Sequence, residues 1–169
     1  QVKKINGADC GFAYRSSNFK SFAPPMVILS AVLRLELVND LQLAEIRLKM
    51  KDILQDRLSK SAEGGSVGSV FRNFVFSEEE IIELKNKFSD LPEKFIESRK
   101  IPAGWLIEQC GLKGKQIGGA IVSKKHAGKI ANIDNATASD VIMLISIIKQ
   151  KVRSNFGLQL IEEFEYVGF

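Results

Sequence analysis

Hydrophobic and polar residues alternate strictly over residues 27–37 of this chain. The apolar side chains that would lie on one side of an extended backbone are Val27, Leu29, Ala31, Leu33, Leu35 and Leu37. A period of two residues is typical of a β-strand with one buried face. Apolar residues then recur at helical spacing from Leu43 to Leu58, after Asn39 or Asp40, either of which can cap a helix. The pattern therefore predicts a strand followed by a helix.

The composition changes at residues 59–66, which are mainly small and polar. Such segments are typical of linkers, and we predict a domain boundary near residue 62. A strand is predicted at 70–76, and a capping box that begins at Ser77 opens another helix. Residues 91–102 contain two prolines and are predicted to be a polar connection.

The rest of the chain mixes short strands and helices. The predicted elements are a short helix at 105–110, strands at 116–122 and 129–133, a long helix that Thr137 caps and that ends near Gly157, and a last strand at 158–167. Long connections and hairpin-compatible strands favour an α+β fold over a doubly wound sheet. No Gly-x-Gly-x-x-Gly follows a predicted strand, so the sequence contains no dinucleotide fingerprint of the Rossmann type.

Composition and charge narrow the function classes only slightly. The 169 residues are 45% apolar and carry a net charge of +4, which favours anionic partners such as nucleotides, phosphates or nucleic acid. A nucleic-acid binder stays open on this ground, although the sequence has no aromatic-basic pattern of the RNA-recognition type. No stretch approaches the ~18 consecutive apolar residues of a membrane span. Cys10 and Cys110 have no metal-ligand spacing and are typical of thiols in a reducing compartment.

The stretch from 103 to 120 is the most informative in the sequence. A short apolar helix breaks at Gly111, and a basic, glycine-rich turn leads to a strand start at Ile117. Because glycine has no Cβ, such a turn lets the backbone approach another group closely. By itself the stretch predicts a tight turn beside a possible anion site.

Two other loops carry candidate chemistry. Arg15 follows Tyr14 among small polar residues, and arginine grips carboxylates and phosphates through two parallel hydrogen bonds. The alternative is a surface loop with an incidental arginine. Ser69 follows a glycine, so its hydroxyl can approach a ligand closely; without a nearby histidine base it is a poor nucleophile, but it can deliver a proton. The alternative is an ordinary turn serine.

His126 and the acidic residues near the C-terminus are the remaining candidates. His126, the only histidine, lies in a basic loop, where it can donate to a phosphate or simply be exposed. No carboxylate or thiolate is spaced to join it, so no metal site is predicted. In the last predicted strand, Glu163 and Glu165 share one side and Glu162 takes the other. A carboxylate buried among the apolar neighbours would have a raised pKa and could act as acid or base, whereas exposed ones would mark a charged edge strand.

Four of these stretches, in this order, resemble the UDP-N-acetylenolpyruvoylglucosamine reductase family, the flavoenzymes of peptidoglycan precursor synthesis. They are the tyrosine-arginine loop at 12–20, the serine motif at 68–73, the glycine-rich segment at 103–120 with its continuation to 141, and the C-terminal segment at 156–168. Together they cover nearly the whole chain. The ordered set is specific, although no single motif is.

The resemblance implies a role for each candidate residue. At the family's catalytic arginine, proton-donating serine and catalytic glutamate, this chain has Arg15, Ser69 and Glu163. At positions where the family contacts its UDP-sugar substrate, it has Tyr14, Asn73 and His126. The implied reaction is the reduction of UDP-N-acetylglucosamine enolpyruvate to UDP-N-acetylmuramate by FAD and NADPH in cell-wall biogenesis. Arg15 would support the developing negative charge, Ser69 would protonate C2 of the substrate, and Glu163 would orient or polarise the intermediate.

The resemblance also implies an organisation for the chain. Residues 1–62 would be the tail of an FAD-binding α+β domain of the PCMH type, residues 63–155 a substrate-binding domain with a mixed or antiparallel sheet and flanking helices, and residues 156–169 a C-terminal strand carrying Glu163. The family's glycine-rich FAD-binding loops are not found in the sequence, and the chain opens with neither methionine nor a signal peptide. We therefore expect the C-terminal half of a cytoplasmic enzyme, inactive without its N-terminal half and with no membrane or nucleic-acid partner. A stand-alone UDP-sugar binding module is the alternative.

Three features depart from the family's pattern. Phe74 stands where a proline is usual, and Glu165 stands where an arginine is common. An acidic residue at position 165 speaks against a phosphate contact there. The segment from 75 to 102 is also longer than expected.

Overall fold

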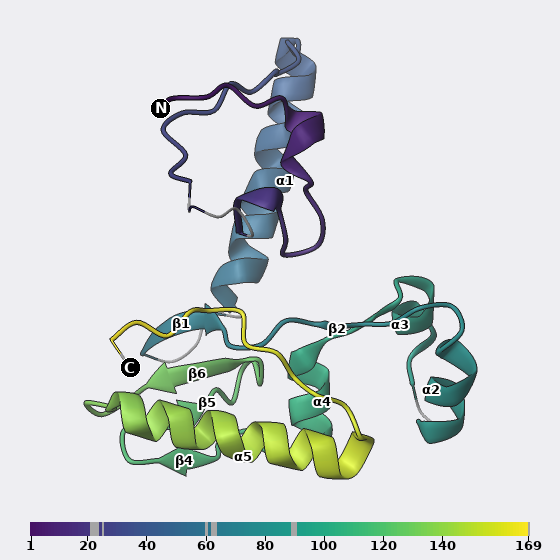
Figure 1. Ribbon diagram of the computed structural model, residues 1–169, viewed down its shortest axis with the longest axis vertical. Helices are drawn as coiled ribbons and strands as arrows, with labels where there is room; N and C mark the ends of the chain where they lie inside the picture. The colour runs from purple at the N-terminus through teal and green to yellow at the C-terminus, as the bar shows by residue number, and fades with distance from the viewer. Residues whose placement is uncertain (21–23, 25, 60, 62–63, 89–90, 169) are drawn as a thin grey trace. The chain divides into compact units, whose positions relative to one another are not determined.

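The structure is a computed structural model that describes residues 1–20, 24, 26–59, 61, 64–88 and 91–168. The chain divides into two compact units, Gln1–Lys49 and Met50–Phe169, and each is described by itself (Figure 1). The boundary predicted at residue 62 falls outside the described residues. In the described parts of the chain, no helix is both long and apolar enough to cross a membrane.

The N-terminal unit contains two 3-10 helices, η1 (Gly7–Cys10) and η2 (Asn18–Lys20), and the first half of α1 (Asp40–Ser59). The predicted helix is confirmed, and so is its cap. Asn39 Oδ1 accepts a hydrogen bond from the amide of Gln42 at 2.9 Å, and the Asn39 amide donates to Gln42 Oε1 at 3.0 Å. No residue of α1 is buried, so its apolar stripe is exposed.

The strand predicted at 27–37 is wrong, because this segment has no regular secondary structure. Side chains from both sides of the alternation are exposed: Leu33 to 78% and Val32 to 96%. A strand needs a neighbour to satisfy its backbone N–H and C=O groups. None of the described residues forms a ladder with this segment. The alternation identifies a surface fit for burial but not the element that would bury it.

The C-terminal unit is built on a four-stranded antiparallel sheet in the order β1-β6-β5-β4. Its strands are β1 (Gly65–Ser69), β4 (Gln116–Ile117), β5 (Ala120–Val122) and β6 (Lys129–Asn132). The single strand predicted at 116–122 is therefore a hairpin that turns at Gly118 and Gly119, whereas the strand predicted from 129 is confirmed. Helix α5 (Ala138–Phe156) lies along this sheet (Figure 1). The α+β class is confirmed.

Helix α5 begins and ends as its sequence predicts. Thr137 Oγ1 accepts from the Asp140 amide at 3.2 Å while Asp140 Oδ2 accepts from the Thr137 amide at 2.9 Å, which completes a capping box. Gly157 ends the helix in the left-handed conformation with φ 66°. The buried stripe of α5 consists of Leu144, Ile145, Ile148 and Val152.

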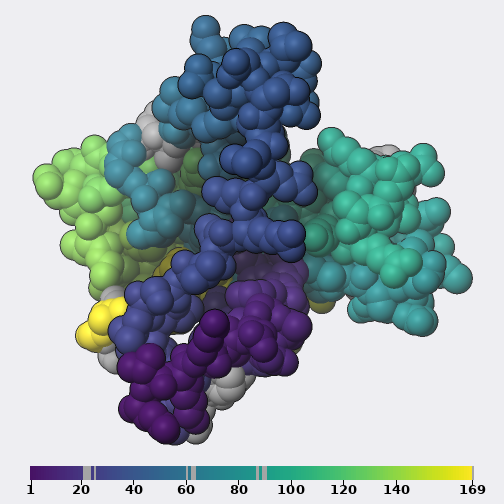
Figure 2. All heavy atoms as spheres, turned by 90° about the horizontal axis from the view of Figure 1, so that it is seen from above, coloured from purple at the N-terminus to yellow at the C-terminus, as the bar shows by residue number. Residues whose placement is uncertain are grey.

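A two-stranded sheet of β2 (Phe74–Val75) and β3 (Lys100–Ile101) leads into and out of a helical lobe. The lobe contains α2 (Ile81–Lys87) and α3 (Glu93–Glu97), and it stands to one side of the unit in both views (Figures 1 and 2). The single strand predicted at 70–76 is thus wrong in extent, since only 74–75 form β2. The lobe fills the segment that the family resemblance left unexplained.

The polar connection predicted at 91–102 is also wrong, because it contains α3 and β3. Pro92 and Pro102 are the N-cap residues of α3 and of α4 (Ala103–Gln109), so both prolines precede helices. Aromatic contacts join the lobe to the rest of the unit. The ring of Phe88 stacks on Phe156 at 5.0 Å between centroids, and Phe95 meets Trp105 edge-on at 5.6 Å.

Candidate functional site

The C-terminal segment runs beside the residues that follow β1. The amide of Glu163 donates to the carbonyl of Val70 at 2.9 Å, and the amide of Arg72 donates to the carbonyl of Ile161 at 2.9 Å. These two bonds flank an isolated antiparallel bridge between Phe71 and Glu162. The strand predicted at 158–167 is therefore wrong in extent. Among the described residues, the pairing of this segment is confined to this bridge, and residues 165–168 are exposed.

This pairing brings together two of the sequence-predicted catalytic residues. Ser69 is the last residue of β1, and the next residue, Val70, holds the backbone of Glu163. Gly68 has φ 84°, and the pairing of β1 with β6 shifts register between Ser66 and Ser69. Such a bulge re-aims the side chains beside it and is frequent next to active sites. Ser69 is exposed and Glu163 is half-buried, so both are within reach of a ligand.

His126 lies in the loop that joins β5 and β6, and its orientation is fixed by the backbone around it. Its amide donates to Ser123 Oγ at 3.2 Å, and its Nδ1 accepts from the Gly128 amide at 3.2 Å. Because Nδ1 is an acceptor, the neutral ring carries its proton on Nε2. His126 can therefore donate one hydrogen bond from Nε2 to a ligand.

A shallow pocket of about 180 Å³ adjoins His126. Its lining includes Lys125, Trp105 and Glu108, so a cation, an aromatic ring and a carboxylate border the same small space. Gly104 allows α4 to approach this loop, because a Cβ there would lie 3.1 Å from the Gly128 nitrogen. The pocket suits a polar, partly anionic group.

Asn73 positions the helix that forms one wall of this pocket. Its Oδ1 accepts from the amide of Ala103, the first residue of α4, at 3.3 Å. Through this bond Asn73 holds the first residue of α4, so at least one polar atom of Asn73 is hydrogen-bonded within the protein.

The basic glycine-rich turn predicted before Ile117 is confirmed as a turn, and the amides of Gly111, Leu112, Gly114 and Lys115 donate to carbonyls of the protein. A second turn, at Gly118 and Gly119, lies against a carboxylate of the protein. A Cβ on Gly119 would lie 1.9 Å from the Asp134 carbonyl oxygen, and one on Gly118 would lie 2.5 Å from the Asp140 carboxyl group. Hydrogen bonds from the backbone and side chain of Thr137, and then from the Gly119 amide, lower the pKa of Asp140. The turn is therefore a structural joint between the β4–β5 hairpin and the start of α5.

Tyr14 and Arg15 lie in the N-terminal unit, so the structure describes them apart from Ser69 and Glu163. They form the tip of a tight turn that two hydrogen bonds close, Ala13 amide to Ser16 carbonyl at 3.0 Å and the reverse at 3.1 Å. Arg15 has φ 54°, an uncommon conformation for a residue other than glycine. Its guanidinium carbon lies 5.8 Å from the centroid of the Tyr14 ring.

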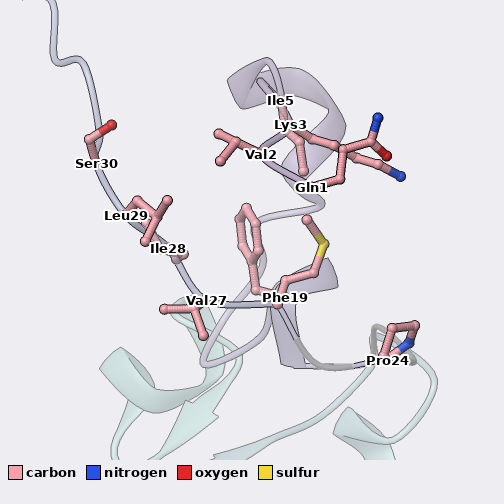
Figure 3. Close-up of a pocket in the computed structure, with 11 residues that line it drawn as sticks. Gln1, Val2, Lys3, Ile5, Phe19, Pro24, Val27, Ile28, Leu29 and Ser30 are labelled. Atoms are coloured by element: carbon pink, nitrogen blue, oxygen red, sulfur yellow. The ribbon is translucent and has the colours of Figure 1, made fainter.

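The N-terminal unit also has a large hollow that sequence reasoning missed. Its volume is about 830 Å³, and none of the six sequence-predicted site residues lines it. The side chains around it are mostly apolar, and Figure 3 shows Val2, Ile5, Phe19, Val27 and Leu29 among them. Val27 and Leu29 belong to the alternating segment, but that pattern did not predict a hollow. A hollow of this lining is suited to apolar side chains rather than to catalysis.

Sequence reasoning also missed one cluster beside Glu163. Lys149 of α5 forms an ion pair with Glu162, and the Tyr166 hydroxyl hydrogen-bonds to the same carboxylate. Burial, followed by the negative charge of Glu162, raises the pKa of Tyr166. Nothing in the local pattern pairs positions 149 and 162, which meet only in the folded chain. Within the described ranges, no group of three or more His, Cys, Asp or Glu residues could hold a metal ion.

Comparisons with known proteins show which family this chain resembles. Residues 59–167 match the family model described as UDP-N-acetylenolpyruvoylglucosamine reductase, C-terminal domain. The curated reductase of that name from Chloroherpeton thalassium is 39% identical over 169 residues, covering 99% of this chain and 47% of its own. That from Pasteurella multocida is 34% identical over 185 residues, covering 99% of this chain and 54% of its own.

A solved structure agrees with these relatives. The crystal structure of UDP-N-acetylenolpyruvylglucosamine reductase from Thermus caldophilus aligns with a TM-score of 0.62 at 25% identity, covering 94% of this chain and 46% of that one. The chain spans about half the length of the relatives that it matches.

Proposed function

This chain belongs to the UDP-N-acetylenolpyruvoylglucosamine reductase family, and on that premise we propose that it supplies the proton-donating and substrate-binding side of such a reductase. The reaction is the reduction of UDP-N-acetylglucosamine enolpyruvate to UDP-N-acetylmuramate in peptidoglycan synthesis. NADPH as electron donor, FAD as cofactor and a cytoplasmic location belong to the same proposal. They rest on the family resemblance.

The observation that carries the proposal is the pairing of Glu163 with Val70. It sets the backbone of Glu163 beside that of Val70, the residue after Ser69, and Ser69 is exposed at a bulge. In the proposed roles, Ser69 delivers the proton to C2 of the enolpyruvyl group, and Glu163 orients or polarises the developing intermediate. Positioned proton transfer of this kind contributes on the order of 10²–10⁴ in rate.

Arg15 supplies positive charge in the proposed mechanism. A guanidinium can pair with the substrate carboxylate through two parallel bonds and stabilise the charge that builds up there. The support for this role is the uncommon backbone conformation of Arg15 and the Tyr14 ring that flanks its guanidinium. Strained positions of this sort cluster at functional sites.

His126 and its pocket are the proposed contact for the nucleotide part of the substrate. The Nε2 proton of His126 and the ammonium group of Lys125 are both suited to phosphate oxygens. Asn73 contributes by holding α4 in place. Tyr14 is proposed to contact the substrate from the side of Arg15.

The residues described here do not fit FAD by themselves. A flavin pyrophosphate needs a free cradle of backbone amides, and in the glycine-rich turn at 111–115 the amides of Gly111, Leu112, Gly114 and Lys115 donate to carbonyls of the protein. We therefore derive no step through the flavin. Its binding region is proposed to lie in the part of the relatives that this chain does not match, about half of their length.

The test uses the complete protein that contains this chain. Purified protein is given NADPH and the enolpyruvyl substrate, and the product is identified by mass spectrometry. Formation of UDP-N-acetylmuramate with equal consumption of NADPH is expected. If UDP-N-acetylglucosamine enolpyruvate binds but is never reduced, the protein is a stand-alone UDP-sugar binding module. The matched relatives, named as reductases, do not favour that alternative.

A further inference from the structure

The C-terminal segment that carries Glu163 is held by few backbone bonds. Two of them, Arg72 to Ile161 and Glu163 to Val70, join it to the residues after β1. The buried side chains of Leu158 and Leu160 anchor the start of the segment, whereas this bridge is short. A contact beyond Leu160 would therefore restrain the part of the segment that carries Glu163.

An ion pair between α5 and this segment provides that contact. Lys149 Nζ donates to Glu162 Oε1 at 2.9 Å and to Glu162 Oε2 at 3.1 Å. The two side chains are 30% and 19% exposed, whereas the surface pair of Arg99 and Glu78 is 51% and 72% exposed. Partial burial shields the pair from solvent, so it constrains its partners more than a surface pair does.

Two aromatic residues of the same segment lie near the pair. Tyr166 hydrogen-bonds to the Glu162 carboxylate, and its ring meets Phe164 edge-on at 5.1 Å. Glu163 follows Glu162 directly and begins a bend in the backbone. Binding Glu162 to Lys149 therefore restrains the backbone immediately before Glu163.

We propose that Lys149 is a positioning residue for Glu163, acting through its ion pair with Glu162. The catalytic role of Glu163 in this inference rests on the proposed function. The restraint that Lys149 places on the position of Glu163 does not. Without the pair, the bridge between Phe71 and Glu162 opens more often and Glu163 loses its fixed position. A misplacement of about 1 Å at a catalytic group can cost on the order of 10²-fold in rate.

The first test follows amide hydrogen exchange in the 169-residue chain by NMR. Lys149→Met and Glu162→Gln each remove the ion pair from one side, and Lys149→Arg restores it. Lys151→Met, at an exposed position of the same helix, is the matched control. The amides of Glu163 and Arg72 are expected to exchange about tenfold faster in the two disruptive variants only. Unchanged exchange at both amides, or an equal increase throughout α5, overturns the proposal.

The second test measures kinetics in the complete protein. Lys149→Met is expected to lower kcat by about 10- to 100-fold with the KM for the UDP-sugar within about twofold, and Lys149→Arg is expected to recover most of the loss. A parallel rise of KM with constant kcat would reject positioning. If Glu163→Gln leaves turnover intact while exchange at Glu163 responds to Lys149, the proposed role of Glu163 fails and the positioning contact stands.

Discussion

The amide of Glu163 donates to the carbonyl of Val70 at 2.9 Å, which sets the C-terminal segment beside the residue that follows Ser69. Two candidate catalytic side chains from opposite ends of the C-terminal unit therefore stand on neighbouring stretches of backbone. The bulge at Gly68 lies beside Ser69, and the ion pair of Lys149 with Glu162 lies beside Glu163. Substitutions in the C-terminal unit are expected to change either the rate of reaction or the free energy of unfolding, and these two effects can be measured separately.

Ser69→Ala in the complete protein is expected to spare the reduction of the flavin by NADPH and to slow product formation by on the order of 10²–10⁴-fold. The reason is that Ser69 is assigned to proton delivery, which follows flavin reduction. Stopped-flow absorbance separates the two half-reactions. Ser66→Ala, at an exposed position of the same strand, is the control. An unchanged turnover number in Ser69→Ala would reject the assignment.

Gly119→Ala is expected to destabilise the chain by about 1–3 kcal/mol or more, because the added methyl group meets backbone rather than a movable side chain. Gly65→Ala is the matched control, since nothing lies within 4 Å of a Cβ at that position. Urea unfolding followed by circular dichroism measures both. Equal urea midpoints for the two variants would show that the turn shifts to accommodate the added methyl group.

Thr137→Ala is expected to lower the free energy of unfolding by about 1 kcal/mol, the usual cost of losing an N-cap side chain. The lost contact is the bond from the Asp140 amide to Thr137 Oγ1. Ser139→Ala, an exposed residue in the first turn of α5, serves as the comparison. A loss confined to Thr137→Ala confirms the capping box, whereas similar losses in both variants would point to helix propensity instead.

The free energy of unfolding is expected to depend on pH through the carboxyl group of Asp140. Its pKa is lowered in the folded protein by hydrogen bonds from Thr137 and Gly119, so its carboxylate stabilises the fold at pH values above its ordinary pKa of about 3.9. That contribution is lost as the pH falls through the lowered folded pKa. The stability difference between the wild type and Asp140→Asn should therefore be constant from about pH 7 to 5 and shrink below about pH 4. A difference independent of pH down to the acid transition contradicts this.

The 169-residue chain on its own is expected not to retain FAD, because the family's glycine-rich FAD-binding loops are not found in its sequence and the amides of its turn at 111–115 are bonded within the protein. The measurement is the absorbance spectrum after incubation with FAD and gel filtration, with the complete protein as positive control. A stoichiometric flavin spectrum from the short chain would place a cofactor site among residues to which none is assigned.

Local hydrogen bonds made the helices predictable from sequence. The cap at Asn39, the capping box of Thr137 and Asp140, and the left-handed Gly157 each depend on residues within one turn of one another. The ordered motifs likewise indicate the family from the sequence alone. Sequence therefore determined where α1 and α5 begin and end, and which side chains are candidates for chemistry.

Tertiary structure decided what those candidates contact. The alternating residues at 27–37 looked like a strand, but a strand exists only where another backbone pairs with it. The basic glycine-rich turn before Ile117 looked open to an anion, yet the amides of Gly111, Gly114 and Lys115 donate to carbonyls of the protein. Pairing of Glu163 with Val70 and of Lys149 with Glu162 joins positions far apart in sequence. Such contacts depend on how elements pack, and no pattern within one segment encodes the neighbour that it will meet.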